Sequence, residues 1–176
     1  MFLALCIVLP FLTMQIPQLG STLLPMHLPV LLCGFICGGP YGLAVGAVAP
    51  VLRSAIFGLP SMFPTAAAMA FELAVYGLMS GILLRALPKK NLSVYISLIA
   101  AMVTGRAVWG AVSWLFYGLA GTAFTWGIFI SGAVLNALAG IAIQIVLVPL
   151  LVIALRRAKL IDNEGNRANR EPAAPS

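Results

Sequence analysis

Three ionisable residues stand inside stretches of the sequence that are otherwise apolar: Arg53, Glu72 and Arg106. A charge at the centre of a lipid bilayer costs at least about 2.5 to 3.5 kcal/mol, so such residues face a protein interior or a watery cavity. Two arginines and one glutamate leave one positive charge without a protein partner. The carboxylate or phosphate of a ligand could neutralise it, because the guanidinium offers a bidentate fork to such groups. The alternative is an internal ion pair, Glu72 with either arginine, that only fixes helix packing.

Other polar and aromatic residues follow in the same stretches. Tyr76 comes one helical turn after Glu72, and Trp109 comes one turn after Arg106 on nearly the same helix face. Asn136 lies within the last apolar stretch of the chain. We expect these side chains and the three charged ones to line one substrate site. For Trp109, a place in the aromatic belt at the membrane surface remains the alternative.

The residues needed for enzyme chemistry are not found together in this sequence. The single histidine, His27, and one carboxylate within the apolar stretches cannot form a Ser-His-Asp set. The sequence has no His-Glu-x-x-His motif and no phosphate-cradling glycine loop followed by lysine. We interpret Cys6, Cys33 and Cys37 as small apolar residues, and His27 as an interfacial residue at the outer start of its helix. The sequence therefore predicts a protein that is not an enzyme and needs no cofactor or metal.

The composition predicts the environment that must hold these residues. Of 176 residues, 62% are hydrophobic and 8% are charged, whereas a soluble domain usually carries about 25% charged residues. The mean hydropathy is +1.09. Such a chain can cover its apolar surface only in a lipid bilayer, and about 20 residues per span leave room for about six helices. The net charge of +6 does not indicate nucleic acid, because the basic residues cluster beside the apolar stretches.

Turn signals divide the chain into an all-α membrane bundle of six transmembrane helices. The predicted helices cover residues 1–14, 27–38, 41–57, 65–87, 92–118 and 127–155, and the second and third are short for full spans. Residues 1–155 would form one transmembrane substrate-binding domain. Residues 156–176 are polar and rich in Asn, Pro and Ala, so we expect a disordered cytoplasmic tail.

The basic residues predict the orientation in the membrane. Three of the ten Lys and Arg residues lie at the turn between the fourth and fifth helices, and five follow the sixth helix: Arg85, Lys89 and Lys90, then Arg156, Arg157, Lys159, Arg167 and Arg170. With an even number of helices, both groups fall on one side of the membrane. The positive-inside rule makes that side cytoplasmic, so both termini are predicted to be cytoplasmic.

Small residues predict where the helices approach one another. Glycines recur every four residues across the second and third helices, at Gly34, Gly38, Gly42 and Gly46. The fourth helix repeats Ala66, Ala70 and Ala74, followed by Gly77 and Gly81. Such spacing lets helix backbones approach closely within a membrane. We expect internal packing for most of these residues, with a docking surface for a partner helix as the alternative.

Several longer segments resemble a known family. Residues 24–46 (LPMHLPVLLCGFICGGPYGLAVG), 49–65 (APVLRSAIFGLPSMFPT), 70–77 (AFELAVYG) and 105–110 (GRAVWG) are similar to the substrate-binding S components of energy-coupling factor (ECF) transporters. The similarity covers roughly residues 1–155. The chain differs from the family pattern in the first helix, where family members commonly carry an Ala-x-x-x-Ala motif and this chain has Ala4 and Val8.

The resemblance implies a six-helix protein of the bacterial cell membrane that binds a vitamin or related micronutrient. The site would open outward, between the outer loops and the fourth to sixth helices. The protein would dock onto a transmembrane T component driven by two cytoplasmic ATPase subunits, and would topple in the membrane to release substrate. The positive charge excess favours an acid such as pantothenate, while folate, biotin, riboflavin and a cobalamin precursor remain open. A stand-alone ion-coupled secondary transporter is the alternative function.

Overall fold

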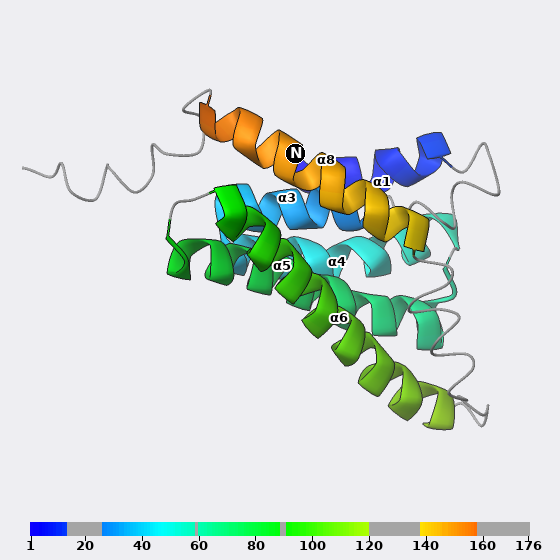
Figure 1. Cartoon of the computed structure of the whole chain (residues 1–176). Helices are drawn as coiled ribbons and strands as arrows, with labels where there is room; N and C mark the ends of the chain where they lie inside the picture. Colours follow the sequence, from blue (N-terminus) through cyan, green and yellow to red (C-terminus); the bar gives the residue numbers. More distant parts are fainter. Residues whose placement is uncertain (14–25, 59, 89–90, 120–137, 158–176) are drawn as a thin grey trace, which may run out of the picture.

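The fold is given by a computed structural model that describes residues 1–13, 26–58, 60–88, 91–119 and 138–157. This described part of the chain is helical throughout (Figure 1). Its elements, in chain order, are α1 (Phe2–Thr13), α3 (His27–Cys37), α4 (Gly39–Phe57), the short wide turn η1 (Met62–Ala66), α5 (Ala67–Ala86), α6 (Asn91–Leu119) and α8 (Leu138–Arg157).

The observed helix bounds follow the predicted ones closely, with one informative difference. The helix predicted for residues 41–57 begins earlier, at Gly39, so α4 has 19 residues. Gly38 adopts a φ of 103°, a conformation that suits glycine and ends α3. Pro40 then lies in the first turn of α4, where its missing N–H costs nothing. For the sixth predicted helix, only the part from Leu138 onward lies within the described residues.

The helices have the length and composition of membrane spans. Within the described residues, three segments are long and apolar enough to cross a bilayer: Gly39–Phe57, Met62–Ala86 and Asn91–Gly118. Two shorter apolar helices, His27–Cys37 and Gly140–Leu155, accompany them. Large apolar side chains such as Val103, Val146 and Leu150 are more than half exposed on the outside of the bundle, where lipid would cover them. The prediction of a helical membrane protein is confirmed, and the count of six spans stays a prediction.

Glycines bring α3, α4 and α5 into backbone contact. A Cβ atom added at Gly77 would collide with the backbone of Gly42, and one at Gly46 would collide with the backbone of Leu73. A Cβ atom added at Gly34 of α3 would likewise collide with the carbonyl oxygen of Gly77. Lipid provides no hydrophobic drive for helix association, so such close approach is a main source of attraction between these helices. The predicted internal packing of small residues is confirmed at these positions.

The remaining helices complete the bundle around this three-helix unit (Figure 1). α6 packs along α5, α8 packs against both α3 and α6, and α1 lies beside α3 and α4. The core where α3, α5, α6 and α8 meet is made of fully buried apolar side chains: Val30, Leu31, Leu73, Val94, Leu98, Val148 and Val152. The first turn of α6 and the last turn of α8 lie at the same end of the bundle.

Candidate functional site

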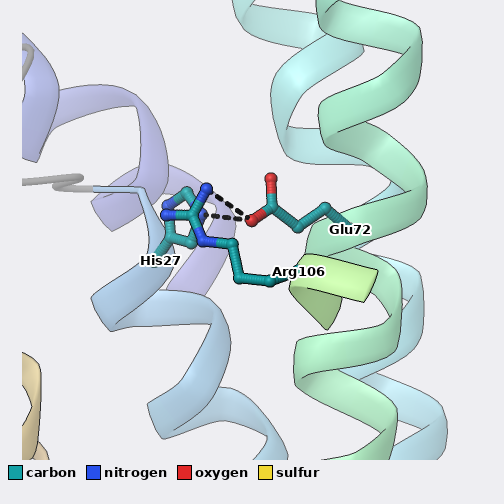
Figure 2. Close-up of polar contacts among 3 residues, drawn as sticks. All are labelled: His27, Glu72 and Arg106. Carbon is teal, nitrogen blue, oxygen red and sulfur yellow. Dashed lines mark ion pairs between the residues drawn. The ribbon is translucent and has the colours of Figure 1, made fainter. Parts of the chain in front are cut away.

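Two of the three predicted intramembrane charges meet in the interior of the bundle. Arg106 Nη1 of α6 lies 3.1 Å from Glu72 Oε1 of α5. His27 Nε2, from the first residue of α3, lies 3.6 Å from the same carboxylate oxygen. Figure 2 shows the guanidinium and the imidazole both directed at this oxygen. Three helices, α3, α5 and α6, thus each contribute one polar side chain to a common centre.

The centre is shielded from its surroundings and its hydrogen bonding is incomplete. The side chains of Glu72 and His27 are 1% and 2% exposed, and that of Arg106 is 14% exposed. Within the described part of the chain, Arg106 Nε and Nη2 and both imidazole nitrogens of His27 have no hydrogen-bond partner. Buried polar atoms are nearly always paired, so several unpaired ones on neighbouring side chains indicate a place for a ligand or ordered water.

Tyr76 supports this centre from one turn along α5. Its side chain is 1% exposed and interacts with those of Glu72 and Arg106. The Tyr76 ring also meets the His27 ring edge-on, with centroids 5.2 Å apart and an interplanar angle of 67°. A Cβ at Gly105 would lie 3.2 Å from the Tyr76 ring, so the absent side chain lets α6 approach and places Arg106 against α5. Tyr76 is therefore brought into the cluster, as its spacing from Glu72 predicts.

Arg53, the third predicted intramembrane charge, contacts the residue that precedes His27. Arg53 Nη1 of α4 lies 3.4 Å from the sulfur of Met26. Met26 directly precedes His27 and is itself buried. The side chain of Arg53 is half-buried, so this second cation lies close to the start of α3, which carries His27.

The last two predicted site residues are placed differently. Trp109 is half-buried on α6, one turn beyond Arg106. Asn136 lies outside the described residues. Of the predicted site residues, the fold brings together Glu72, Tyr76 and Arg106, and it adds His27 to this cluster.

The interpretation of His27 as an interfacial residue was wrong, because its side chain is buried and faces Glu72. The physical reason is the length of α3. Its 11 residues extend over about 16 Å, far short of a hydrocarbon core of about 30 Å. The last residue of α3 and the following Gly38 lie beside Arg85, on the last turn of α5, at one end of the bundle. Because α3 is short, its first residue lies within the bundle and does not reach the opposite end. A helix too short to span the membrane was the signal in the sequence that pointed to a buried histidine.

The described residues contain no group of three or more His, Cys, Asp or Glu side chains that could hold a metal ion. Cys6 and Cys33 are buried thiols, and the Cys6 sulfur lies 3.9 Å from the Met26 carbonyl oxygen. The polar centre therefore has the chemistry of a binding site, with cationic donors and one carboxylate, rather than that of a nucleophile with its base.

The described part of the chain is thus a bundle of apolar helices of the kind that spans membranes, with a buried and partly unpaired polar centre. The chain belongs to the family of ECF transporter substrate-specific components, whose family model, described as "ECF transporter, substrate-specific component", matches residues 1–152. No curated protein and no solved structure matches the chain.

Membership of this family assigns the chain its general role. It is a multi-pass membrane protein and the substrate-binding subunit of an uptake transporter. Such subunits work with a transmembrane and ATPase module and are transport proteins rather than enzymes. The resemblance seen in the sequence is thereby confirmed.

Proposed function

We propose that this S component binds an organic acid, with pantothenate as the first candidate, and delivers it to the ATP-driven ECF module. The observation that carries the proposal is the free edge of Arg106. Glu72 holds Nη1, while Nε and Nη2 are buried and have no hydrogen-bond partner within the described residues. These two nitrogens form one side of the guanidinium, and their spacing matches the two oxygens of a carboxylate.

The surrounding charges favour an anion at this edge. Glu72 neutralises Arg106, and the half-buried Arg53 adds a second positive charge near the start of α3. An incoming carboxylate would be attracted by both guanidinium groups, and burial strengthens such charge-assisted hydrogen bonds. Under this proposal His27 joins the residues that the sequence predicts to contact or orient the substrate. Those residues are Arg53, Glu72, Tyr76, Arg106, Trp109 and Asn136.

The proposal includes an orientation in the bacterial cell membrane. The end of the bundle that carries Arg85 and the end of α8 would be cytoplasmic, by the positive-inside rule. Arg106 lies about 22 Å along α6 from Asn91. In a hydrocarbon core of about 30 Å, this places the site in the outer half, where substrate enters from outside. Residues 1–155 would form the six-span binding domain, and residues 156–176 a cytoplasmic tail.

Two ligands that differ only in the carboxylate test this function. The purified protein in detergent is titrated by calorimetry with pantothenate and with its alcohol analogue, in which CH2OH replaces the carboxylate. Arg106→Gln removes the guanidinium fork. Arg85→Gln is the matched control, because Arg85 is exposed on the last turn of α5, where its guanidinium donates to the Cys37 carbonyl and lies beside Gly38, away from Glu72.

We expect the wild type and the Arg85→Gln control to prefer the acid by tenfold or more, which corresponds to about 1.4 kcal/mol or more. A hydrogen-bonded charge pair of this kind contributes about 1.5 to 3 kcal/mol. Arg106→Gln should bind the acid and the alcohol equally weakly. An unchanged preference in Arg106→Gln would show that Arg106 only fixes helix packing through Glu72.

A further inference from the structure

His27 is the single histidine of the sequence, and its ring lies at the polar centre with both nitrogens unpaired. Its side chain is 2% exposed, and Nε2 lies 3.6 Å from Glu72 Oε1 (Figure 2). A neutral imidazole offers one donor and one acceptor, whereas an imidazolium offers two donors. Imidazole is also the side chain that ordinarily gains or loses its proton near neutral pH. The ring is therefore placed to hold a proton against a buried carboxylate.

The ionisable groups around His27 come from the helices packed about α3. They contact the imidazole, the carboxylate that it faces or the preceding Met26: Cys6 on α1, Arg53 on α4, Glu72 and Tyr76 on α5, and Arg106 on α6. α3 itself carries Cys33 and Cys37 farther along, and α8 has no ionisable side chain before its last two residues. Thiols and tyrosine ordinarily stay uncharged at neutral pH, so the charges that act on His27 come from one carboxylate and two guanidinium groups.

The balance of these charges changes when an acid binds. Glu72 carries one negative charge, and Arg106 and Arg53 carry one positive charge each, so their sum opposes a further positive charge on His27. A carboxylate on the Nε–Nη2 edge of Arg106 would bring the sum to zero. Arg106 Nη1 and His27 Nε2 lie 3.1 Å and 3.6 Å from the same Glu72 oxygen, so the guanidinium and the imidazole are close neighbours. At this range within a protein, an added negative charge favours the protonated form of a base.

We propose that His27 is a proton-binding site coupled to the substrate site, neutral without substrate and protonated when the carboxylate binds. This inference rests on the proposed function, in which Arg106 holds the carboxylate. The proton comes from solvent and joins the ring nitrogen that lacks one, and the imidazolium then donates from Nε2 toward Glu72. Because such coupling is reciprocal, protonation of His27 strengthens acid binding, and affinity rises as the pH falls. Substrate and proton therefore enter and leave the site together.

Two measurements on the purified protein in detergent test this coupling. Calorimetry of pantothenate and its alcohol analogue at one pH, in buffers of different ionisation enthalpy, gives the number of protons taken up per ligand bound. It is performed on the wild type and on His27→Gln, in which an uncharged amide replaces the ring. Nuclear magnetic resonance of protein labelled with ¹⁵N-histidine, after removal of any histidine tag, then shows one imidazole, because the chain has one histidine. Its nitrogen shifts distinguish the neutral ring from the imidazolium.

We expect the wild type to take up a proton, or a measurable fraction of one, with the acid and none with the alcohol. Its affinity for the acid should rise by up to about tenfold per pH unit between about pH 8 and pH 6, because His27 titrates there. The acid should also convert the imidazole signal to that of the imidazolium. His27→Gln should bind the acid without proton uptake, and its affinity should not change with pH in this range.

Two results would overturn the inference. The first is acid binding by the wild type with no proton uptake and an unchanged imidazole signal, a result that does not depend on the folding of any variant. The second is proton uptake that persists in His27→Gln, which would move the proton to another group such as Glu72.

The failure of this inference can be told apart from the failure of the proposed function. A preference for acid over alcohol that depends on Arg106, without proton uptake, would overturn the role of His27 and leave the proposed function standing. Equal binding of acid and alcohol by the wild type, or binding of neither, would overturn both.

Discussion

Glu72→Gln is the substitution that separates charge from shape at the centre of the site. Glutamine has the size of glutamate, so no cavity forms. The negative charge alone is removed. It lies 3.1 Å from Arg106 Nη1 and 3.6 Å from His27 Nε2, on a side chain that is 1% exposed.

The magnitude follows from the burial of the pair. Removing one partner of a buried ion pair costs about 3 to 5 kcal/mol, because the other charge stays behind without compensation. The 14% exposure of the Arg106 side chain favours the lower end, about 3 kcal/mol. For a chain of this size, 1 kcal/mol shifts the unfolding temperature by about 2 to 4 °C. We therefore expect Glu72→Gln without ligand to unfold about 6 to 12 °C below the wild type.

The same variant should gain more than the wild type from an acidic ligand. A bound carboxylate on the Nε–Nη2 edge of Arg106 returns the missing negative charge, so pantothenate should raise the unfolding temperature of Glu72→Gln further than that of the wild type. The alcohol analogue should raise both equally. The assay is thermal unfolding in detergent at several ligand concentrations, with Arg85→Gln as the control for loss of an exposed charge.

Two results would refute this reasoning. An unfolding temperature of Glu72→Gln equal to that of the wild type would mean that the carboxylate carries no net charge or no useful pairing in the folded protein. An equal gain from acid and alcohol would mean that the ligand does not supply a charge near Arg106.

Further substitutions test the packing and the second layer of the site. Gly77→Ala should destabilise the protein by about 1 to 3 kcal/mol or more, because its Cβ would collide with the Gly42 backbone. Gly118→Ala, at a helical position with nothing within 4 Å, should be neutral or stabilising by up to about 1 kcal/mol, and thermal unfolding compares the two. Tyr76→Phe keeps the ring but removes the hydroxyl that interacts with Glu72, so calorimetry should show acid binding weakened about tenfold. Unchanged affinity would limit Tyr76 to packing.

The sequence alone could predict the charged part of the site because charge is conspicuous in an apolar stretch. Glu72 and Arg106 have few reasons to occur there unless they are paired, and the fold pairs them. The spacing of Tyr76 from Glu72 also sufficed, since one helical turn fixes their common face. The glycine repeat similarly predicted the contact of α4 with α5, because lipid-embedded helices approach closely only at small residues.

The place of His27 could not be predicted in the same way. His27 was misplaced because helix ends usually lie at the membrane surface. The shortness of its helix was the hint in the sequence, and the packing of α3 shows that its start is buried.

The arrangement divides the bundle into parts with separable tasks. α3, α4 and α5 touch through backbone at Gly34, Gly42 and Gly77, which fixes His27 and Glu72 relative to one another. The group proposed to bind the substrate carboxylate, Arg106, comes instead from α6, which approaches α5 at Gly105, against the Tyr76 ring, and otherwise packs through larger side chains. Substitutions at Gly34, Gly42 or Gly77 should therefore lower stability and affinity for every ligand together. Substitution of Arg106 should change which ligand is preferred, so a ratio of affinities, rather than a single affinity, reports on the site.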